Sequence, residues 1–121
     1  MSSYLLDTHI VLWLAASPEQ LSEPVKTVLL DSNVRLYASI ASAWEVAIKI
    51  SLGKLELTGG VDSFFQICTT NGIQVLPVKQ NHLAVVQDMP FIHRDPFDRV
   101  LLATAQTEGL TLLSADSQIH R

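Results

Sequence analysis

The chain has 121 residues, of which 48% are hydrophobic and 17% are charged. This is enough apolar material for one core and too little length for two domains, so we expect a single domain over residues 1–121 and exclude a disordered chain. The net charge of −4 counts against nucleic-acid binding. That objection weakens if four of the 12 acidic residues bind metal, because the other eight then balance the eight basic residues.

Neither a membrane span nor a disulfide fits this composition. No apolar run approaches the ~20 residues that a bilayer-spanning helix needs. No basic leader precedes the first apolar stretch, which Asp7 interrupts, so we expect no signal peptide. The single cysteine, Cys68, excludes an internal disulfide and a cysteine-rich metal site. These features predict a cytoplasmic protein without a membrane partner.

Predicted strands and helices alternate along the chain. The first half gives a strand at 3–6, helices at 8–15 and 22–31, a strand at 34–38 and a helix at 40–52. The second half gives a helix at 61–71, a strand at 73–76, helices at 79–87 and 95–108, a strand at 110–113 and a short helical tail. Strands that are apolar on both faces and separated by helices predict an α/β fold with a mainly parallel sheet.

Two acidic residues follow predicted strands directly. Asp7 comes after the first strand and Asp116 comes shortly after the last. In open parallel sheets the ligand crevice lies beyond the carboxyl ends of the strands, so both acids are candidates for a site there. The alternative is that each merely caps the helix that follows.

The helix predicted over 40–52 carries one polar stripe on an otherwise apolar surface. Ser42, Glu45 and Lys49 are spaced at i, i+3 and i+7, which places them on one side of the helix. This stripe must face water or a polar cleft. It therefore indicates either a solvated Glu45–Lys49 pair or an acid that lines a site.

A fourth acid lies in the first turn of the helix predicted over 95–108. Asp95 is its expected N-cap, whereas Asp98 heads the side that continues with Leu101 and Ala105, which we expect to face the core. An acid that points inward needs a partner, because an unpaired buried charge is costly.

Several carboxylates in one crevice would repel each other, and a divalent cation removes that repulsion. Oxygen-only ligands suit Mg²⁺ or Mn²⁺ better than zinc. The sequence has no zinc-ligand spacing and no glycine-rich phosphate loop. A metal site without a nucleotide cofactor is therefore the better hypothesis.

Four segments together carry a family resemblance, which extends from Tyr4 to about Asp116. LLDTHIVLW, ASAWEVAIK, HRDPFDRVLLATAQ and LLSAD, in this order, resemble PIN-domain proteins and more narrowly the VapC-type ribonuclease toxins of bacterial toxin–antitoxin pairs. The resemblance implies a three-layer α/β/α fold and Mg²⁺- or Mn²⁺-dependent endonuclease activity on single-stranded RNA. It leaves open whether the family's last edge strand is present in a chain that stops at Arg121.

By position, the resemblance implies a catalytic, metal-binding quartet of Asp7, Glu45, Asp98 and Asp116. Such a site would hydrolyse a phosphodiester by in-line attack of water. Thr8 matches the small polar residue that often follows the family's first acid.

Several basic and aromatic residues flank the predicted site. The candidate RNA contacts are Thr8, Lys49, Arg94 and Arg99, with Lys54 as a further phosphate contact; the basic residues could equally be solvated charges. Trp13, Trp44, Phe91 and Phe97 could stack on bases, but core packing is the favoured interpretation of all four.

Two other functions remain open from the sequence. One is a catalytically silent PIN-like interaction module. The other is an aspartyl-phosphate receiver domain, which is disfavoured because only one acid follows the first strand and no lysine follows Lys79. The expected partners are RNA, a cognate antitoxin protein implied by the resemblance, and a second copy of the chain, because a small domain this apolar is expected to pair.

Overall fold

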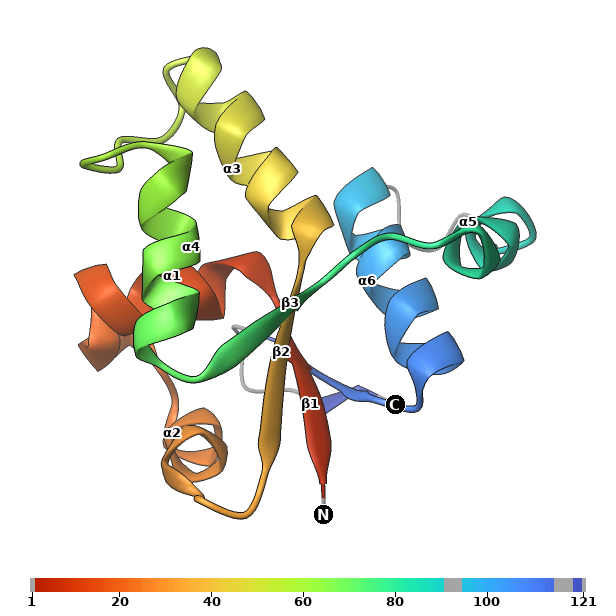
Figure 1. Cartoon of the computed structure of the whole chain (residues 1–121), viewed down its shortest axis with the longest axis horizontal. Coiled ribbons are helices and arrows are strands. Elements are labelled where there is room, and N and C mark those ends of the chain that lie inside the picture. The colour runs from red at the N-terminus through yellow and green to blue at the C-terminus, as the bar shows by residue number, and fades with distance from the viewer. Residues whose placement is uncertain (1, 91–94, 115–118, 121) are drawn as a thin grey trace.

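The computed structural model describes residues 2–90, 95–114 and the backbone of 119–120. Within these residues the strands form one sheet in the order β3-β2-β1-β4-β5 (Figure 1). The strand bounds are β1 Ser3–Leu6, β2 Arg35–Ser39, β3 Ile73–Leu76, β4 Thr111–Leu113 and β5 Ile119–His120. The pairs β1–β2, β2–β3 and β1–β4 are parallel, which confirms the predicted α/β fold with a mainly parallel sheet.

Helices cover both faces of this sheet. Their bounds are α1 Thr8–Ala16, α2 Glu23–Leu30, α3 Ile40–Ser51, α4 Val61–Thr70, α5 Gln80–Gln87 and α6 Pro96–Glu108, with a 3₁₀ turn at Pro18–Gln20 that the sequence did not predict. The other helix bounds lie within a residue or two of the predicted ones. In the described part of the chain, no helix is long and apolar enough to cross a membrane.

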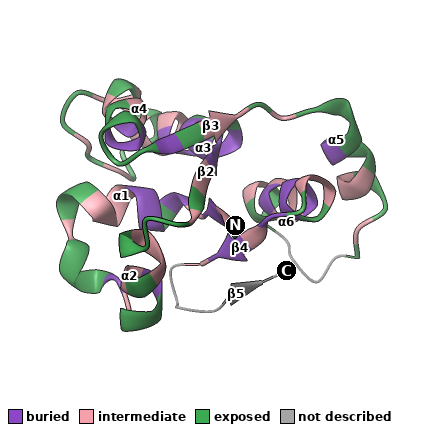
Figure 2. Cartoon of the chain, turned by 60° about the horizontal axis from the view of Figure 1, so that its bottom comes forward, coloured by how far each residue is buried: buried purple, intermediate pink, exposed green. Residues whose placement is uncertain are grey.

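The alternation of side chains along β1 divides the interior into two cores. Leu6 packs with residues of α1 to α4, whereas Leu5 packs with Leu101 and Ala105 of α6. Successive side chains of a strand point to opposite faces, so neighbouring leucines serve opposite layers. Figure 2 shows the buried surfaces of α1, α3 and α6 turned inward, as a three-layer α/β/α fold requires.

Residues 119–120 form an edge strand where a short helical tail was predicted. At residues 119–120 the backbone pairs antiparallel with β4, in the register Leu112↔His120 and Leu113↔Ile119. The prediction of a helix is therefore wrong at these residues, and the edge strand that the resemblance left open is present. Pairing with β5 covers backbone groups of β4 that would otherwise form an unpaired sheet edge.

Helix α5 is joined to α6 through a buried histidine. His82 is fully buried, its Nδ1 accepts the Lys79 backbone N–H at 3.0 Å, and its Nε2 lies 2.7 Å from Glu108 Oε2. An Nδ1 that accepts a hydrogen bond carries no proton in the neutral ring, so Nε2 is the donor to the carboxylate. The hydrogen bond from His82, together with the nearby Lys79 charge, lowers the pKa of Glu108. No sequence pattern indicated this contact.

Glu108→Gln is expected to destabilise the fold at neutral pH and to have little effect in acid. A carboxylate whose pKa is lowered by folding contributes stability above its ordinary pKa, and that stability disappears as the pH falls through the lowered value. The melting-temperature difference from wild type should therefore shrink on acidification. Glu23→Gln, at an exposed i,i+3 pair with Lys26, is the control. A difference that does not change with pH would refute this role of the Glu108 charge.

Candidate active site

Two helices begin at the same edge of the sheet. α1 starts directly after β1, where Asp7 caps it by accepting the Ile10 N–H on Oδ1 at 3.0 Å. α3 starts directly after β2, where the Ser39 hydroxyl accepts the Ala41 N–H at 3.0 Å. Because β1 and β2 are parallel neighbours, the first turns of both helices lie beyond the carboxyl ends of the strands.

The carboxylate of Glu45 is held between these two helices. Glu45 is only 6% exposed, and its Oε1 accepts the Thr8 hydroxyl at 2.7 Å. Its Oε2 accepts from Lys49 Nζ at 2.8 Å, and the Thr8 and Ser42 hydroxyls are hydrogen-bonded at 2.9 Å. The predicted polar stripe of α3 therefore faces a polar contact with α1, and the predicted Glu45–Lys49 pair forms as part of it.

The charge on Lys49 connects this cluster to the start of α6. The pKa of Lys49 is raised, first by its hydrogen bond to Glu45 and then by the negative charges of Glu45, Asp95 and Asp98, against the opposing effect of burial. Asp95 and Asp98 are therefore within electrostatic reach of the Glu45 cluster. In Figure 1 the start of α6 lies beside the first turns of α3.

The two acids of α6 have different local roles. Asp95 is the N-cap, as predicted, and its Oδ1 accepts the N–H groups of Phe97 and Asp98 at 2.8 and 3.4 Å. Asp98 is exposed, so the expectation that it points into the core is wrong. Leu101 and Ala105 are buried against the sheet, whereas Asp98 lies one turn earlier, at the edge where the candidate site is.

An aromatic pair joins α3 to α6. Trp44 and Phe97 meet edge to face, with ring centroids 5.4 Å apart, and Trp44 remains 64% exposed. The expectation that Trp44 packs in the core is therefore wrong. The cause is helical rotation of about 100° per residue: because Glu45 and Val46 use the inward side of α3, Trp44 is turned outward.

The remaining predicted site residues are distributed as follows. Arg99 donates from Nη2 to the backbone carbonyls of Val86 and Met89, at 2.9 and 3.2 Å, and so holds the end of α5. This interaction was not predicted. Asp116 and Arg94 lie outside the described residues, as does Phe91. Among the described residues, no group of three or more Asp, Glu, His or Cys side chains is positioned to hold a metal ion.

A pocket of about 300 Å³ adjoins the cluster between α1 and the segment that follows α3. Thr8 and Lys49 belong to both the cluster and the pocket wall. The wall also includes Lys54 and Trp13, whose ring centroid lies 5.8 Å from that of His9. Several predicted candidates are thus gathered on one side of Glu45.

Sequence reasoning missed the role of Ser42, although it placed this residue on the polar stripe. The signal was its position three residues before Glu45, which stacks the two side chains on one side of α3. What the sequence could not show is that Thr8 of α1 bonds to both of them.

Solved structures with the same fold include toxin–antitoxin assemblies. The chain superimposes on one from VapBC2 of Rickettsia felis bound to a promoter DNA fragment, with TM-score 0.67, 15% identity, and coverage of 91% of this chain and 85% of that one. The match to VapBC-1 of nontypeable Haemophilus influenzae has a TM-score of 0.59 and 20% identity, and it covers 91% of this chain and 84% of that one. The match to a toxin–antitoxin complex from Klebsiella pneumoniae has a TM-score of 0.56 and 17% identity, and it covers 90% of this chain and 82% of that one. These likenesses confirm the predicted fold class.

Sequence comparison adds the family. Residues 4–121 match the PIN domain, so the chain belongs to the PIN domain family. It is also 26% identical over 121 residues to Ribonuclease VapC22 of Mycobacterium tuberculosis, covering 99% of this chain and 92% of that protein. The predicted resemblance is thereby confirmed.

Thr8→Val is expected to lower the free energy of unfolding by about 1–3 kcal/mol, because it keeps the side-chain volume but removes a buried donor from Glu45 and a partner from Ser42. Urea denaturation measures the change. Thr8→Ser, which keeps the hydroxyl, is the matched control and should stay closer to wild type. A Thr8→Val protein within about 0.5 kcal/mol of wild type would show that this hydrogen bond contributes little.

Proposed function

We propose that this protein is a divalent-metal-dependent endoribonuclease that cleaves single-stranded RNA and acts as the toxin of a toxin–antitoxin pair. The observation that carries the proposal is the buried Glu45 carboxylate, oriented by Thr8 and charge-balanced by Lys49 at the carboxyl edge of a PIN-domain sheet. The relative named as a ribonuclease matches almost the full length of both chains.

The acids at this edge suit a hard divalent cation. Asp7, Glu45 and Asp98 offer only carboxylate oxygens, which Mg²⁺ and Mn²⁺ prefer. Glu45 already binds one positive charge, because Lys49 Nζ lies 2.8 Å from its Oε2. We assign these three acids, with Asp116 as the fourth, to the metal site.

Different residues of the chain have different proposed roles in hydrolysis. When bound, the cation supplies Lewis-acid activation of water and of the phosphoryl oxygens. Asp7, at the N-cap of α1, and Glu45, on α3, would hold the cation from two elements that β1 and β2 position, and Thr8 fixes the direction of the Glu45 carboxylate. Lys49 is the proposed phosphate contact, whereas Arg99 serves mainly to hold α5.

The purified protein should cleave unstructured RNA in Mg²⁺ or Mn²⁺, and EDTA should abolish the cleavage. Asp98→Asn should remove most of the activity and leave folding unchanged or slightly improved, because it keeps the shape of an exposed side chain and lessens the repulsion expected among the acids assigned to the metal site. Gel-based cleavage of a labelled RNA and thermal melting measure the two effects.

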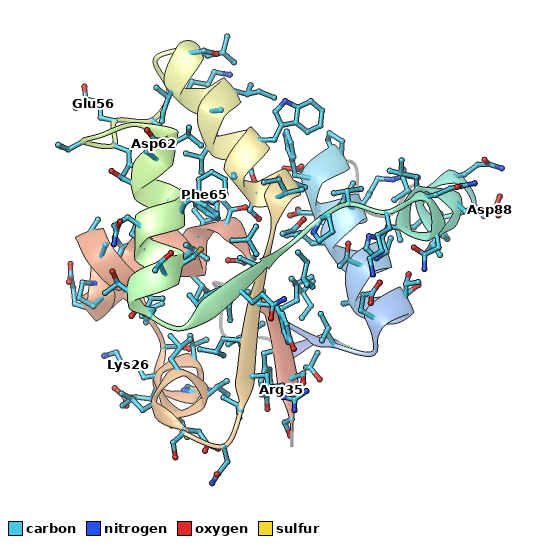
Figure 3. All side chains as sticks on the ribbon, viewed as in Figure 1. Lys26, Arg35, Glu56, Asp62, Phe65 and Asp88 are labelled. Carbon is cyan, nitrogen blue, oxygen red and sulfur yellow. The ribbon has the colours of Figure 1, made fainter. Side chains whose placement is uncertain are left out.

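Asp62→Asn is the matched control for this experiment. Asp62 is also an exposed acid in a first helical turn, but it lies at the start of α4, away from α6 (Figure 3). This variant should cleave as the wild type does. Full activity in EDTA, with nuclease contamination excluded, would contradict metal dependence, and an inactive wild type would favour a silent PIN-like module.

We further propose an antitoxin protein and a second copy of the chain as partners. The structural neighbours come from toxin–antitoxin assemblies. The pocket beside Thr8 and Lys49 includes apolar residues of α1 and of the segment after α3, which suits an inserted segment of another protein. An arginine on that segment would match the acids, because its planar fork can bridge two carboxylates.

Co-expression with the neighbouring reading frame should yield a stable complex that does not cleave RNA. Size-exclusion chromatography with light scattering should show the isolated chain as a dimer and the complex as a larger particle. A strict monomer at tens of micromolar, with no binding neighbour and no toxicity on expression, would refute the toxin assignment but leave the nuclease assignment in place.

A further inference from the structure

Lys49 has an unusual position for a surface lysine. Its side chain is 41% exposed, yet its Nζ lies 2.8 Å from the Oε2 of a carboxylate that is almost completely buried. The other oxygen of that carboxylate accepts the Thr8 hydroxyl. Lys49 therefore reaches Glu45 from the solvent side and supplies the positive charge for an acid that the interior cannot neutralise.

The Lys26–Glu23 pair shows what an ordinary helix pair looks like in the same molecule. Its charged atoms are 3.6 Å apart, and the Glu23 side chain is 87% exposed. Such a pair is screened by water and contributes little. Lys49, in contrast, experiences the charges of Asp95 and Asp98 from α6 as well as that of Glu45.

A divalent cation on Glu45 would meet this ammonium group. Two positive charges a few ångströms apart repel strongly near a protein surface, where the effective dielectric constant is well below that of water. Thr8 and Lys49 each engage one oxygen of Glu45 and leave lone pairs for a cation, so a cation that binds Glu45 closely weakens or replaces the lysine through charge repulsion.

We propose that Lys49 is a built-in counter-cation that competes with the divalent cation for Glu45 and is displaced when that cation binds. This inference rests on the metal dependence proposed above. Displacement turns the Lys49 ammonium away from Glu45 while its charge remains beside the site. The two roles predicted for Lys49, as the partner of Glu45 and as a phosphate contact, then belong to successive states of one side chain.

Metal titration of a charge-removing variant tests the competition. Lys49→Met keeps the length of the side chain and removes its charge, so Mn²⁺ measured by isothermal titration calorimetry should bind about tenfold more tightly than to wild type. Lys26→Met, on α2 and outside the site (Figure 3), should bind Mn²⁺ as wild type does. If wild type binds Mn²⁺ and Lys49→Met binds it with the same or weaker affinity, the inference is overturned while the proposed metal dependence stands.

Stability in the absence of metal gives a readout that does not depend on catalysis. Lys49→Met should melt at a lower temperature than wild type in EDTA, because Glu45 loses its counter-charge. Saturating Mn²⁺ should raise its melting temperature more than it raises that of wild type. An equal rise in both proteins would also overturn the inference.

The wild-type protein provides a check that needs no folded variant. In a Mg²⁺ titration followed by NMR, the Lys49 side-chain signals should shift with the same midpoint as those of Asp7 and Asp98, while Lys26 stays still. Acids that respond to Mg²⁺ while Lys49 keeps its hydrogen-bonded signal would refute displacement. If neither the wild type nor the variants bind Mg²⁺ or Mn²⁺, the proposed metal dependence itself fails, and this inference fails with it.

Discussion

Burial of the Glu45 carboxylate is the constraint on which the geometry of the candidate site depends. A charge in that position is costly unless hydrogen-bond donors and an opposite charge surround it. Thr8 supplies a donor from α1, and Lys49 supplies the charge from the next turn of α3. The same contacts that neutralise the acid therefore fix α1 against α3, so the geometry of the candidate site and the packing of the helices cannot be changed independently at this point.

The topology of the sheet explains why this junction forms at its carboxyl edge. β1 lies between β2 and β4, and both neighbours run parallel to it. β1 and β2 each lead directly into a helix whose free N–H groups must be capped, a role that Asp7 and Ser39 fill. Polar side chains are thus needed at this edge for purely local reasons. A site can be built here because capping already places oxygen atoms around the crevice.

The sequence predicted those parts of the molecule that follow a local period. Alternating strands and helices gave the fold, and the i, i+3, i+7 spacing of the α3 stripe gave the orientation of Glu45. Prediction from the sequence failed where the burial of a residue depends on a contact between elements that are distant in the chain. The ring contact between Trp44 and Phe97 joins α3 to α6, and His82 is buried against a Glu108 that lies 26 residues away. No single-helix pattern contains that information.

Charge balance limits how such a site can meet RNA. The chain carries a net charge of −4, and the candidate site concentrates acids. Of the predicted basic contacts, Arg99 is engaged with the carbonyls that end α5, whereas Lys49 and Lys54 line the pocket beside the cluster. Among the candidates that the structure describes, positive charge for a polyanion therefore comes from these lysines, from the bound cation, or from both. Because Lys49 is held by Glu45 until another cation replaces it, binding of the cation and attraction of RNA become a single coupled event rather than two independent ones.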